Sequence, residues 1–339
     1  MPFYLYFFRR LVFIIPTLLG ITLFSFVIAN AIPTDPMVAN LPQSALNNEA
    51  TVAAFRHHWG LDRPPVERYL TYVANLLRGD MGVSIKSQKP VLDDLKQFLP
   101  ATVELATYGI VVGVIMGVTF GIVSAVWRNK LIDYVVRMVS LLGVSFPVFL
   151  LALVGLSIFY VQLHWVGGTG RMAITAQPPP TITGFFTLDS ILAGRMDKLG
   201  NAISHLILPS VVLGSYVSGM IARVMRSSLL EVMGFDYIRT ARAKGLSERV
   251  VILRHALSNA MIPVVTVIGL SYGNLLSGAV LTESIFAWPG LGRYMFRASS
   301  TQDFPAIMGG SLLIAFIYIM VNFVVDILYY FLDPRIRLG

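Results

Sequence analysis

The sequence predicts an all-α polytopic membrane protein with six transmembrane helices. Of its 339 residues, 55% are hydrophobic and 13% are charged, about half the charged fraction that is usual in soluble domains. Apolar runs long enough to cross a bilayer recur along the chain, and backbone amides in hydrocarbon must bond within their own segment, so each run is read as a helix. Cysteine is absent, which excludes disulfides and thiolate metal sites.

The apolar runs predict the membrane spans in order. Their approximate limits are 11–32, 103–127, 138–161, 204–222, 260–281 and 307–332. Prolines predict kinks inside four of them, at Pro16, Pro147, Pro209 and Pro263. The first run has some features of a signal peptide, but it exceeds the roughly 7–15 apolar residues of a cleaved signal, so we expect a retained anchor.

Two long segments separate these spans on one side of the membrane, 33–102 and 162–203. Turn-forming residues, such as Gly60 in the first and Pro178-Pro179-Pro180 in the second, predict irregular surface loops rather than another domain core. We find no internal repeat, so symmetry within the chain is not expected.

Lysine and arginine are distributed unevenly, and this predicts the orientation. If the N-terminus is cytoplasmic, the inside segments 1–10, 128–137, 223–258 and 333–339 hold 14 of the 26 basic residues. The outside segments hold the rest in more than twice the length, so both termini are expected inside the cell. This bias explains the net charge of +8 better than nucleic-acid binding does.

The inside segment 223–258 has the residues of two short helices joined by a turn. Asp236 is expected to cap a helix that begins at Tyr237, and Gly245 to end that helix in the left-handed conformation. Ser247 and Glu248 then start a second helix. Its predicted apolar stripe consists of Val250, Leu253, Leu257 and Ala260.

The first of these helices combines small and basic side chains. Small residues permit the close approach of another protein's surface, and basic residues attract acidic partners. The small residues are Thr240, Ala241 and Ala243, and the basic residues are Arg239, Arg242 and Lys244. Physical reasoning leaves two interpretations open, a docking element for another protein and attachment to anionic lipid.

Residues 237–245 closely resemble the EAA loop of bacterial ABC importer permeases, in particular the dipeptide, oligopeptide and nickel branch. They are Tyr237, Ile238, Arg239, Thr240, Ala241, Arg242, Ala243, Lys244 and Gly245. The resemblance implies that this loop couples the membrane spans to a cytoplasmic ATPase, with Gly245 as the signature glycine. The general consensus opens with Glu-Ala-Ala, where this chain has Arg239-Thr240-Ala241.

Further motifs extend the resemblance along almost the whole chain. They are Arg9-Arg10-Leu11 with Ile15-Pro16-Thr17, Ile32-Pro33-Thr34-Asp35-Pro36, Arg78-Gly79-Asp80-Met81-Gly82-Val83-Ser84, Trp288-Pro289-Gly290-Leu291-Gly292 and Asp333-Pro334-Arg335-Ile336-Arg337. Thr34 stands where the branch usually has glycine. Six spans that carry these motifs in this order are similar to the type I ABC importer permease fold.

The resemblance implies a bacterial inner-membrane protein that works in a complex. Its partners would be a second homologous permease, two cytoplasmic ATPases that use ATP and Mg, a periplasmic substrate-binding protein and membrane lipid, but no nucleic acid. The chain has no Gly-Lys dipeptide and therefore no Walker A loop, so we expect no enzyme activity, catalytic residue, cofactor or metal on it.

The expected organisation has three parts. Residues 1–102 form an N-terminal helix with a long periplasmic loop, and 103–333 form the transmembrane core with the coupling loop at 223–258. Residues 334–339 form a cytoplasmic tail.

Few other residues indicate chemistry. Asn322 and Asp326 share one face of the sixth span, and we expect a contact between helices there rather than a substrate or proton site. Glu104 is expected at the membrane interface. The five histidines show no metal-ligand spacing, and Gly143-Val144-Ser145 predicts helix packing rather than a hydrolase elbow.

The substrate class stays open at this point. Dipeptides or oligopeptides fit the resemblance best, and nickel, glutathione and oligosaccharides are alternatives within the same branch. A proton-coupled secondary transporter that uses Asp326 is the rival from another class, and a lipid-bound scaffold is a third possibility.

Overall fold

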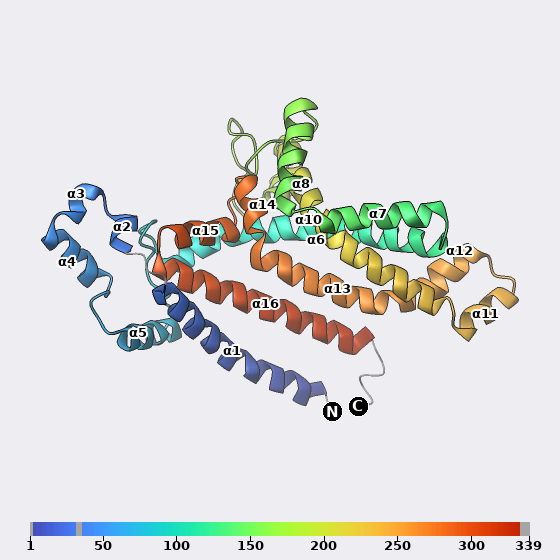
Figure 1. Ribbon diagram of the computed structural model, residues 1–339, viewed down its shortest axis with the longest axis horizontal. Helices are drawn as coiled ribbons and strands as arrows, with labels where there is room; N and C mark the ends of the chain where they lie inside the picture. Colours follow the sequence, from blue (N-terminus) through green and yellow to red (C-terminus); the bar gives the residue numbers. More distant parts are fainter. Residues whose placement is uncertain (1–2, 32–35, 333–339) are drawn as a thin grey trace.

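The computed structural model describes residues 3–31 and 36–332 as helices joined by loops (Figure 1). The described part contains no strand, although Val83 and Pro90 form an isolated β-bridge. The motif residues 32–35 and the C-terminal residues 333–339, which include the motif 333–337 and the predicted tail 334–339, lie outside the described residues.

The first half of the chain contains one long helix on each side of a group of short ones. These elements are α1 (Phe3–Ala31), α2 (Pro36–Asn40), α3 (Gln43–Leu46), α4 (Glu49–His58), α5 (Pro65–Leu77), α6 (Val91–Val126), α7 (Leu131–Ser145), α8 (Val148–Gly155) and the π-helix η1 (Leu156–Gln162). The first predicted outside loop therefore has helical structure of its own in α2–α5.

The second half contains three long helices with shorter ones between them. These elements are α9 (Phe186–Leu192), α10 (Met196–Val232), α11 (Asp236–Ala243), α12 (Glu248–Val250), the π-helix η2 (Val251–Ala256), α13 (Leu257–Gly278), α14 (Val280–Ile285), α15 (Leu291–Ser300) and α16 (Phe304–Leu332). Figure 1 shows α2–α4 at one end of the long axis and α11 and α12 at the other. The first outside loop and the basic loop thus lie at opposite ends.

The helices α6 and α10 form the centre of the bundle, and glycines bring their backbones close together. Four of them recur at every fourth position of α6, namely Gly109, Gly113, Gly117 and Gly121. A Cβ on Gly117 would lie 2.6 Å from Ile221 Cβ, and one on Gly121 would lie 2.5 Å from Met225 Cβ. Carbon atoms do not approach so closely, so larger residues would push the two helices apart.

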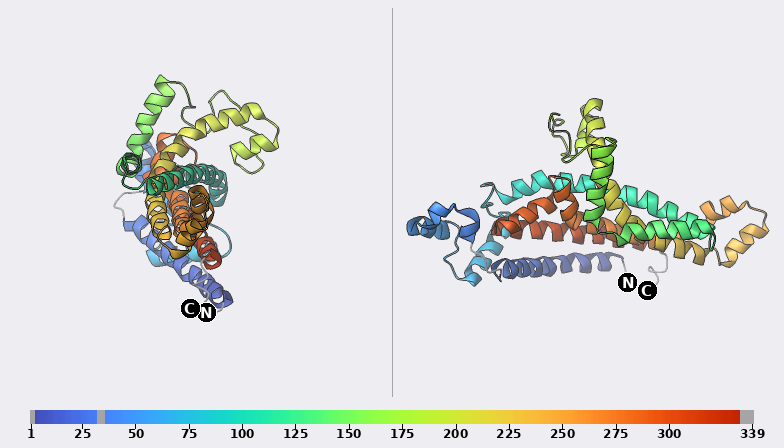
Figure 2. Two further views of the ribbon diagram at one scale, coloured as in Figure 1. Left: turned by 90° about the vertical axis from the view of Figure 1, so that its right-hand side faces the viewer. Right: turned by 45° about the horizontal axis from the view of Figure 1, so that its top comes forward.

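The other long helices pack around this pair. α13 contacts α6, α10 and α16, and α1 packs on the far side of α16 (Figure 2). The main core includes Leu105 of α6, Leu229 of α10 and Val264 of α13, all of them buried. Only 6% of the most apolar stretch of α1 is buried within the chain, so the outer face of this helix is available to lipid.

The third predicted span, 138–161, is broken rather than kinked. α7 ends at Ser145, α8 begins at Val148, and the two helix axes differ by 101°. Pro147 has no amide hydrogen and disfavours helical geometry in the residue before it, and Phe146 accordingly has an extended backbone with φ −77° and ψ 135°. The described residues therefore hold five helices that are long and apolar enough to span a membrane, or six if the bent pair is one span.

Two of the other spans are much longer than their apolar runs. α6 begins at Val91 rather than at 103, and α10 covers Met196–Val232 rather than 204–222. Hydropathy detects only the lipid-soluble part of a helix, whereas tertiary packing continues the helix into water. Pro16, Pro209 and Pro263 lie inside the continuous helices α1, α10 and α13.

Candidate functional site

The predicted coupling residues 237–245 lie together in α11 and the turn that follows it. α11 begins one residue earlier than expected, and Asp236 is not its cap, because Phe235 holds the N-cap position without a side-chain hydrogen bond. Asp236 lies in the first turn instead, where the positive end of the helix dipole stabilises a carboxylate. Its Oδ1 accepts a hydrogen bond of 3.2 Å from Arg239.

Two residues attach α11 to the rest of the chain. Ile238 is fully buried and Ala241 is 7% exposed, and both belong to the core cluster that also contains Val232 and Val251. The remaining members of the set are exposed, namely Tyr237, Arg239, Thr240, Arg242, Ala243, Lys244 and Gly245. The helix is thus fixed along one edge and presents its other faces outward.

Gly245 ends α11 as the sequence predicts. Its φ is +81°, in the left-handed region, and its amide donates to Arg242 O at 2.9 Å. A Cβ built on Gly245 meets no atom within 4 Å. The need for glycine therefore comes from the backbone conformation and not from a lack of space.

Polar contacts fix the turn on both sides of Gly245. Arg242 donates two hydrogen bonds to Glu248, from Nε at 3.0 Å and from Nη2 at 2.6 Å. Asn259 of α13 donates to the hydroxyl of Tyr237 at 2.7 Å. These contacts join α11 to the helix that leads into α13, so a force applied to α11 reaches that helix directly.

The second helix of the loop does not bury the stripe predicted for it. Val250 is 38% exposed and Leu253 is 48% exposed, while Val251, Ile252 and Ala256 are buried. The cause is the π-helical stretch η2, because its wider turn rotates the side chains relative to an α-helix. Ala260, beyond η2, is buried as expected.

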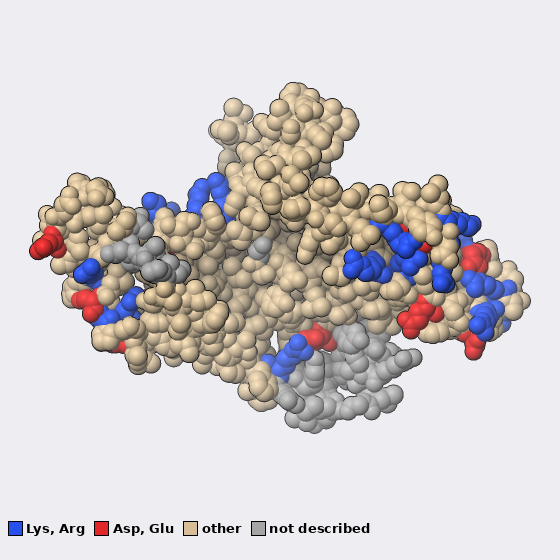
Figure 3. Space-filling view, in the orientation of Figure 1, with Lys and Arg blue, Asp and Glu red and all other residues tan. Residues whose placement is uncertain are grey.

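Lysine and arginine gather at this end of the molecule. Figure 3 shows blue side chains over α11, α12 and the neighbouring ends of α7 and α10. Arg239 is the most open of the paired arginines, with 73% of its side chain exposed. The surface around α11 is therefore basic and accessible.

Behind this surface lies a buried cluster that sequence reasoning missed. Asp133 of α7 is fully buried, and it accepts hydrogen bonds from Ser124 of α6 at 2.5 Å and from Arg226 of α10 at 3.2 and 3.0 Å. Arg137 Nε lies 3.2 Å from the same carboxylate. The cluster joins α6, α7 and α10 next to the loop, and its only local signal was one acidic residue among several basic ones.

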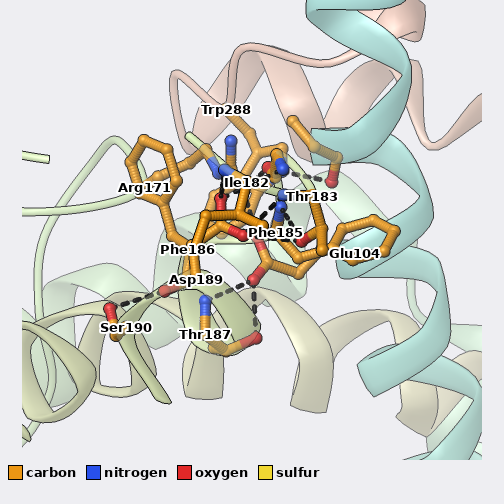
Figure 4. A network of polar contacts seen from close by, with 12 residues as sticks. Glu104, Arg171, Ile182, Thr183, Phe185, Phe186, Thr187, Asp189, Ser190 and Trp288 are labelled. Carbon is orange, nitrogen blue, oxygen red and sulfur yellow. Dashed lines mark hydrogen bonds and ion pairs between the residues drawn. The ribbon is translucent and has the colours of Figure 1, made fainter. Parts of the chain in front are cut away.

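In the N-terminal half of α6, Glu104 is buried rather than interfacial. It is 3% exposed and forms an ion pair with Arg171, and its Oε1 accepts hydrogen bonds from the amide and hydroxyl of Thr187 at 2.9 and 2.7 Å (Figure 4). Arg171 also lies over the ring of Phe186, with 3.6 Å from Cζ to the ring centroid. The segment 162–203, the second predicted outside loop, folds back onto α6 through the contacts of Glu104, whose partners Arg171 and Thr187 are 67 and 83 residues away in sequence.

Asp189 holds the same loop in shape. Burial opposes its ionisation, but hydrogen bonds from Thr183, Ile182 and Gly184 keep its pKa below the ordinary value. The carboxylate therefore stays ionised near neutral pH and acts as a fixed acceptor for the loop backbone.

The motif at 288–292 is part of the same packing. Trp288 is buried and donates to Ala101 O at 2.8 Å, while Glu283 accepts from Thr102 at 2.7 Å and from the amide of Arg293 at 2.8 Å. A Cβ on Gly290 would lie 2.3 Å from Glu283 Oε1. This motif thus packs the α14–α15 turn against α6.

Asp326 forms an ion pair with Arg10, which joins α16 to α1. This is the interhelix contact expected from the sequence. His57 Nδ1 lies 3.0 Å from Asp62 Oδ2. The described residues contain no group of three or more potential metal ligands. Gly143 packs tightly against α10, since a Cβ there would lie 2.7 Å from Ser215 O.

Comparison with known proteins identifies the family. Residues 117–338 match the binding-protein-dependent transport system inner membrane component family, and residues 3–106 match the N-terminal region of such components. The chain is 43% identical over 320 residues to the probable D,D-dipeptide transport system permease protein DdpB of Escherichia coli (strain K12), covering 94% of each chain. It is 43% identical over 329 residues to the dipeptide transport system permease protein DppB of Alkalihalophilus pseudofirmus, covering 97% of this chain and 98% of that one.

A solved structure shares the fold. A chain of the MetNI methionine ABC transporter, in an inward-facing conformation, superimposes with a TM-score of 0.50 at 15% identity, over 71% of this chain and 96% of that one. The family match, the similarity to dipeptide permeases and the several apolar helices identify a multi-pass protein of the bacterial inner membrane. The chain belongs to the family of binding-protein-dependent transport system inner membrane components.

Proposed function

We propose that the chain is the membrane-spanning permease subunit of an ATP-driven importer of dipeptides or short oligopeptides. The observation that carries this proposal is the near-complete match to permeases named for dipeptide transport, at 43% identity. The subunit would form half of the translocation pathway, and a second homologous permease would form the other half. A periplasmic substrate-binding protein would deliver the peptide.

Coupling to ATP is assigned to residues 237–245. The exposed faces of α11, its small side chains and its fixed attachment through Ile238 and Ala241 support this role. Two cytoplasmic ATPases would bind ATP and Mg and hydrolyse the nucleotide, since this chain has no Walker A sequence. When ATP draws them together, α11 would move with its ATPase and favour the outward-open arrangement of the spans.

This proposal includes six spans with both termini in the cytoplasm. Counting the bent pair of α7 and α8 with η1 as one span gives six. The start of α1 points toward the half of the molecule that holds α11 and the basic surface (Figure 1). In this arrangement 1–102 carries the periplasmic loop, 103–333 is the transmembrane core and 334–339 is the tail.

Site-directed crosslinking tests the coupling role. The chain has no cysteine, so Thr240→Cys and Ala243→Cys each introduce a single reactive thiol. We expect both to crosslink to an ATPase subunit in the assembled complex. Ile174→Cys is the matched control, because Ile174 is exposed like the two test positions but lies in the second predicted outside loop. Capture of the ATPase from position 174, or none from 240 and 243, would contradict the assignment.

The substrate is tested separately. The complex is purified with its substrate-binding protein, and the ligand that this protein carries is identified by mass spectrometry. Dipeptides or oligopeptides are expected, while nickel, glutathione or an oligosaccharide would replace the peptide assignment within the same importer class.

The secondary-transporter alternative predicts transport that follows the proton gradient without ATP. The pairing of Asp326 with Arg10 favours a structural role for that carboxylate. Uptake into proteoliposomes without nucleotide, at a rate that depends on Asp326, would support the alternative.

A further inference from the structure

A cavity of ≈ 230 Å³ lies between the outer end of α1, the helix α5 and the start of α16. Its wall is mainly apolar and includes Phe26, Ile85, Phe304 and Met308. The apolar span of α1 ends here at Ala31, and that of α16 begins here at Phe304. The cavity therefore lies at the boundary between hydrocarbon and headgroups. The α5 side of the same cavity is polar.

An arginine is held in this apolar wall. Arg68 Cζ lies 5.8 Å from the ring centroid of Phe26 and 5.9 Å from that of Phe304. Burial lowers the pKa of Arg68, and no carboxylate among the described residues lies within ion-pair distance of it. A guanidinium in this setting retains donors for an anion, because aromatic faces satisfy charge but not hydrogen bonds.

A second donor lies one helical turn away. The hydroxyl oxygen of Tyr72 is buried and has no hydrogen-bond partner among the described residues. Burial raises the pKa of Tyr72 to about 12, so the hydroxyl keeps its proton. Positions 68 and 72 share one face of α5, and both side chains line the cavity.

The remaining charges of the cavity do not neutralise Arg68. Asp80 is the carboxylate among the described lining residues, and its Oδ1 accepts from the amide of Gly82 at 2.8 Å. Arg63 also lines the cavity, and its Nη1 lies 3.7 Å from Glu67 Oε1. The lining thus has an excess of positive charge next to an apolar wall.

We propose that this cavity binds the phosphate headgroup of a membrane phospholipid, with Arg68 and Tyr72 as donors to the phosphate and the phenylalanine-lined wall against the glycerol and upper acyl chain. A small free anion would leave the apolar wall without a partner. A lipid satisfies both sides of the cavity at once and anchors α5 to the membrane surface.

Native mass spectrometry of the intact, detergent-purified complex tests this site, with phosphatidylglycerol as the probe. We expect Arg68→Gln to weaken binding of one phosphatidylglycerol by roughly tenfold and Tyr72→Phe to weaken it by a smaller factor. Arg78→Gln is the matched control, because it removes the same charge from an exposed position at the end of α5, outside the cavity. An equal loss in Arg78→Gln and Arg68→Gln would overturn the proposal.

Further arms distinguish other anions. Inorganic phosphate and a dipeptide are each added in excess, and displacement of the bound lipid by either one would overturn the lipid assignment. Asp35 lies outside the described residues. Lipid binding that is seen in the Asp35→Asn variant but not in the parent protein would overturn the proposal, because it would identify the Asp35 carboxylate as the partner of Arg68. Because the readout is lipid binding, a negative result leaves the transport assignment unaffected.

Discussion

Gly245 illustrates how one backbone angle controls the loop to which we assign coupling. The residue has a φ of +81°, and its hydrogen bond to Arg242 stops α11 before the chain turns toward α12. The ion pair of Arg242 with Glu248 spans this turn. Any change in the turn therefore moves the exposed face of α11 relative to α13.

Gly245→Val is expected to weaken the coupling between ATP hydrolysis and transport. A β-branched residue in the left-handed region costs on the order of 1–2 kcal/mol, which the turn avoids by displacing α11. Peptide uptake and substrate-stimulated ATPase activity in proteoliposomes should fall, while membrane insertion stays normal. Gly245→Asn is the control, since asparagine tolerates this conformation and open space surrounds the site. A valine variant as active as the parent would refute the role of the turn.

Asp133→Asn should destabilise the assembled permease. The change removes the charge that two arginines share and leaves Arg226 beside a neutral amide in a mostly buried site. We expect a loss of about 3 kcal/mol, at the lower end for a broken buried pair, because both arginines retain some access to water. Thermal unfolding of the purified complex measures it.

The control for Asp133 is Asp236→Asn. Asp236 also pairs with an arginine, but 94% of its side chain is exposed. Exposed pairs contribute little, so the melting temperature should not change. Equal shifts in the two variants would contradict the structural role of the buried cluster.

At the scale of elements, glycines let α6 and α10 pack closely along a seam. Gly117→Ala adds a single carbon, which would lie 2.6 Å from Ile221 Cβ and 2.8 Å from Ser218 O. Since backbone and buried atoms surround it, the helices must separate, and overpacking of this kind costs about 1–3 kcal/mol. The melting temperature of the purified complex should fall accordingly.

Gly20→Ala in α1 provides the matched control. No atom lies within 4 Å of the added carbon, and alanine favours helix over glycine. Its melting temperature should stay the same or rise. If Gly117→Ala behaved in the same way, the two helices would not be in close contact at the seam.

At the scale of the whole molecule, the seam and the Asp133 cluster lead us to expect that α6, α7 and α10 move as one rigid unit beside the proposed coupling loop. Packed interiors resist small deformations, so motion is expected at the boundaries of such units. The attachment of α11 through Ile238 and Ala241 makes it part of the same unit.

Spin labels test this rigidity. In Arg128→Cys/Ala243→Cys both positions are exposed, and the chain has no other cysteine. The distance between the two labels should be the same with and without bound ATP analogue. A second pair of labels is placed at position 243 and at the corresponding position of the second permease. The distance between these two labels should change when the ATP analogue binds. A large nucleotide-dependent change within the first pair would show that α11 moves independently of α6 and α7.

The sequence by itself determined those features that depend on short stretches of chain. Apolar length located the spans, the basic residues located one end of the molecule, and Gly245 located the stop of α11. Each is local, because hydrocarbon solubility, charge and a left-handed turn depend on a residue and its near neighbours. Even so, local pattern did not predict that η2 would expose Val250 and Leu253, since it assumed α-helical periodicity.

Only the tertiary structure decided how distant charged residues pair. Glu104 meets Arg171 across 67 positions, and Arg226 meets Asp133 across 93. Read alone, Glu104 at the start of a span is best placed in the interface, since an unpaired buried carboxylate is costly. Its burial became favourable only when the segment 162–203 folded back to supply a cation and two donors, and no local pattern carries that information.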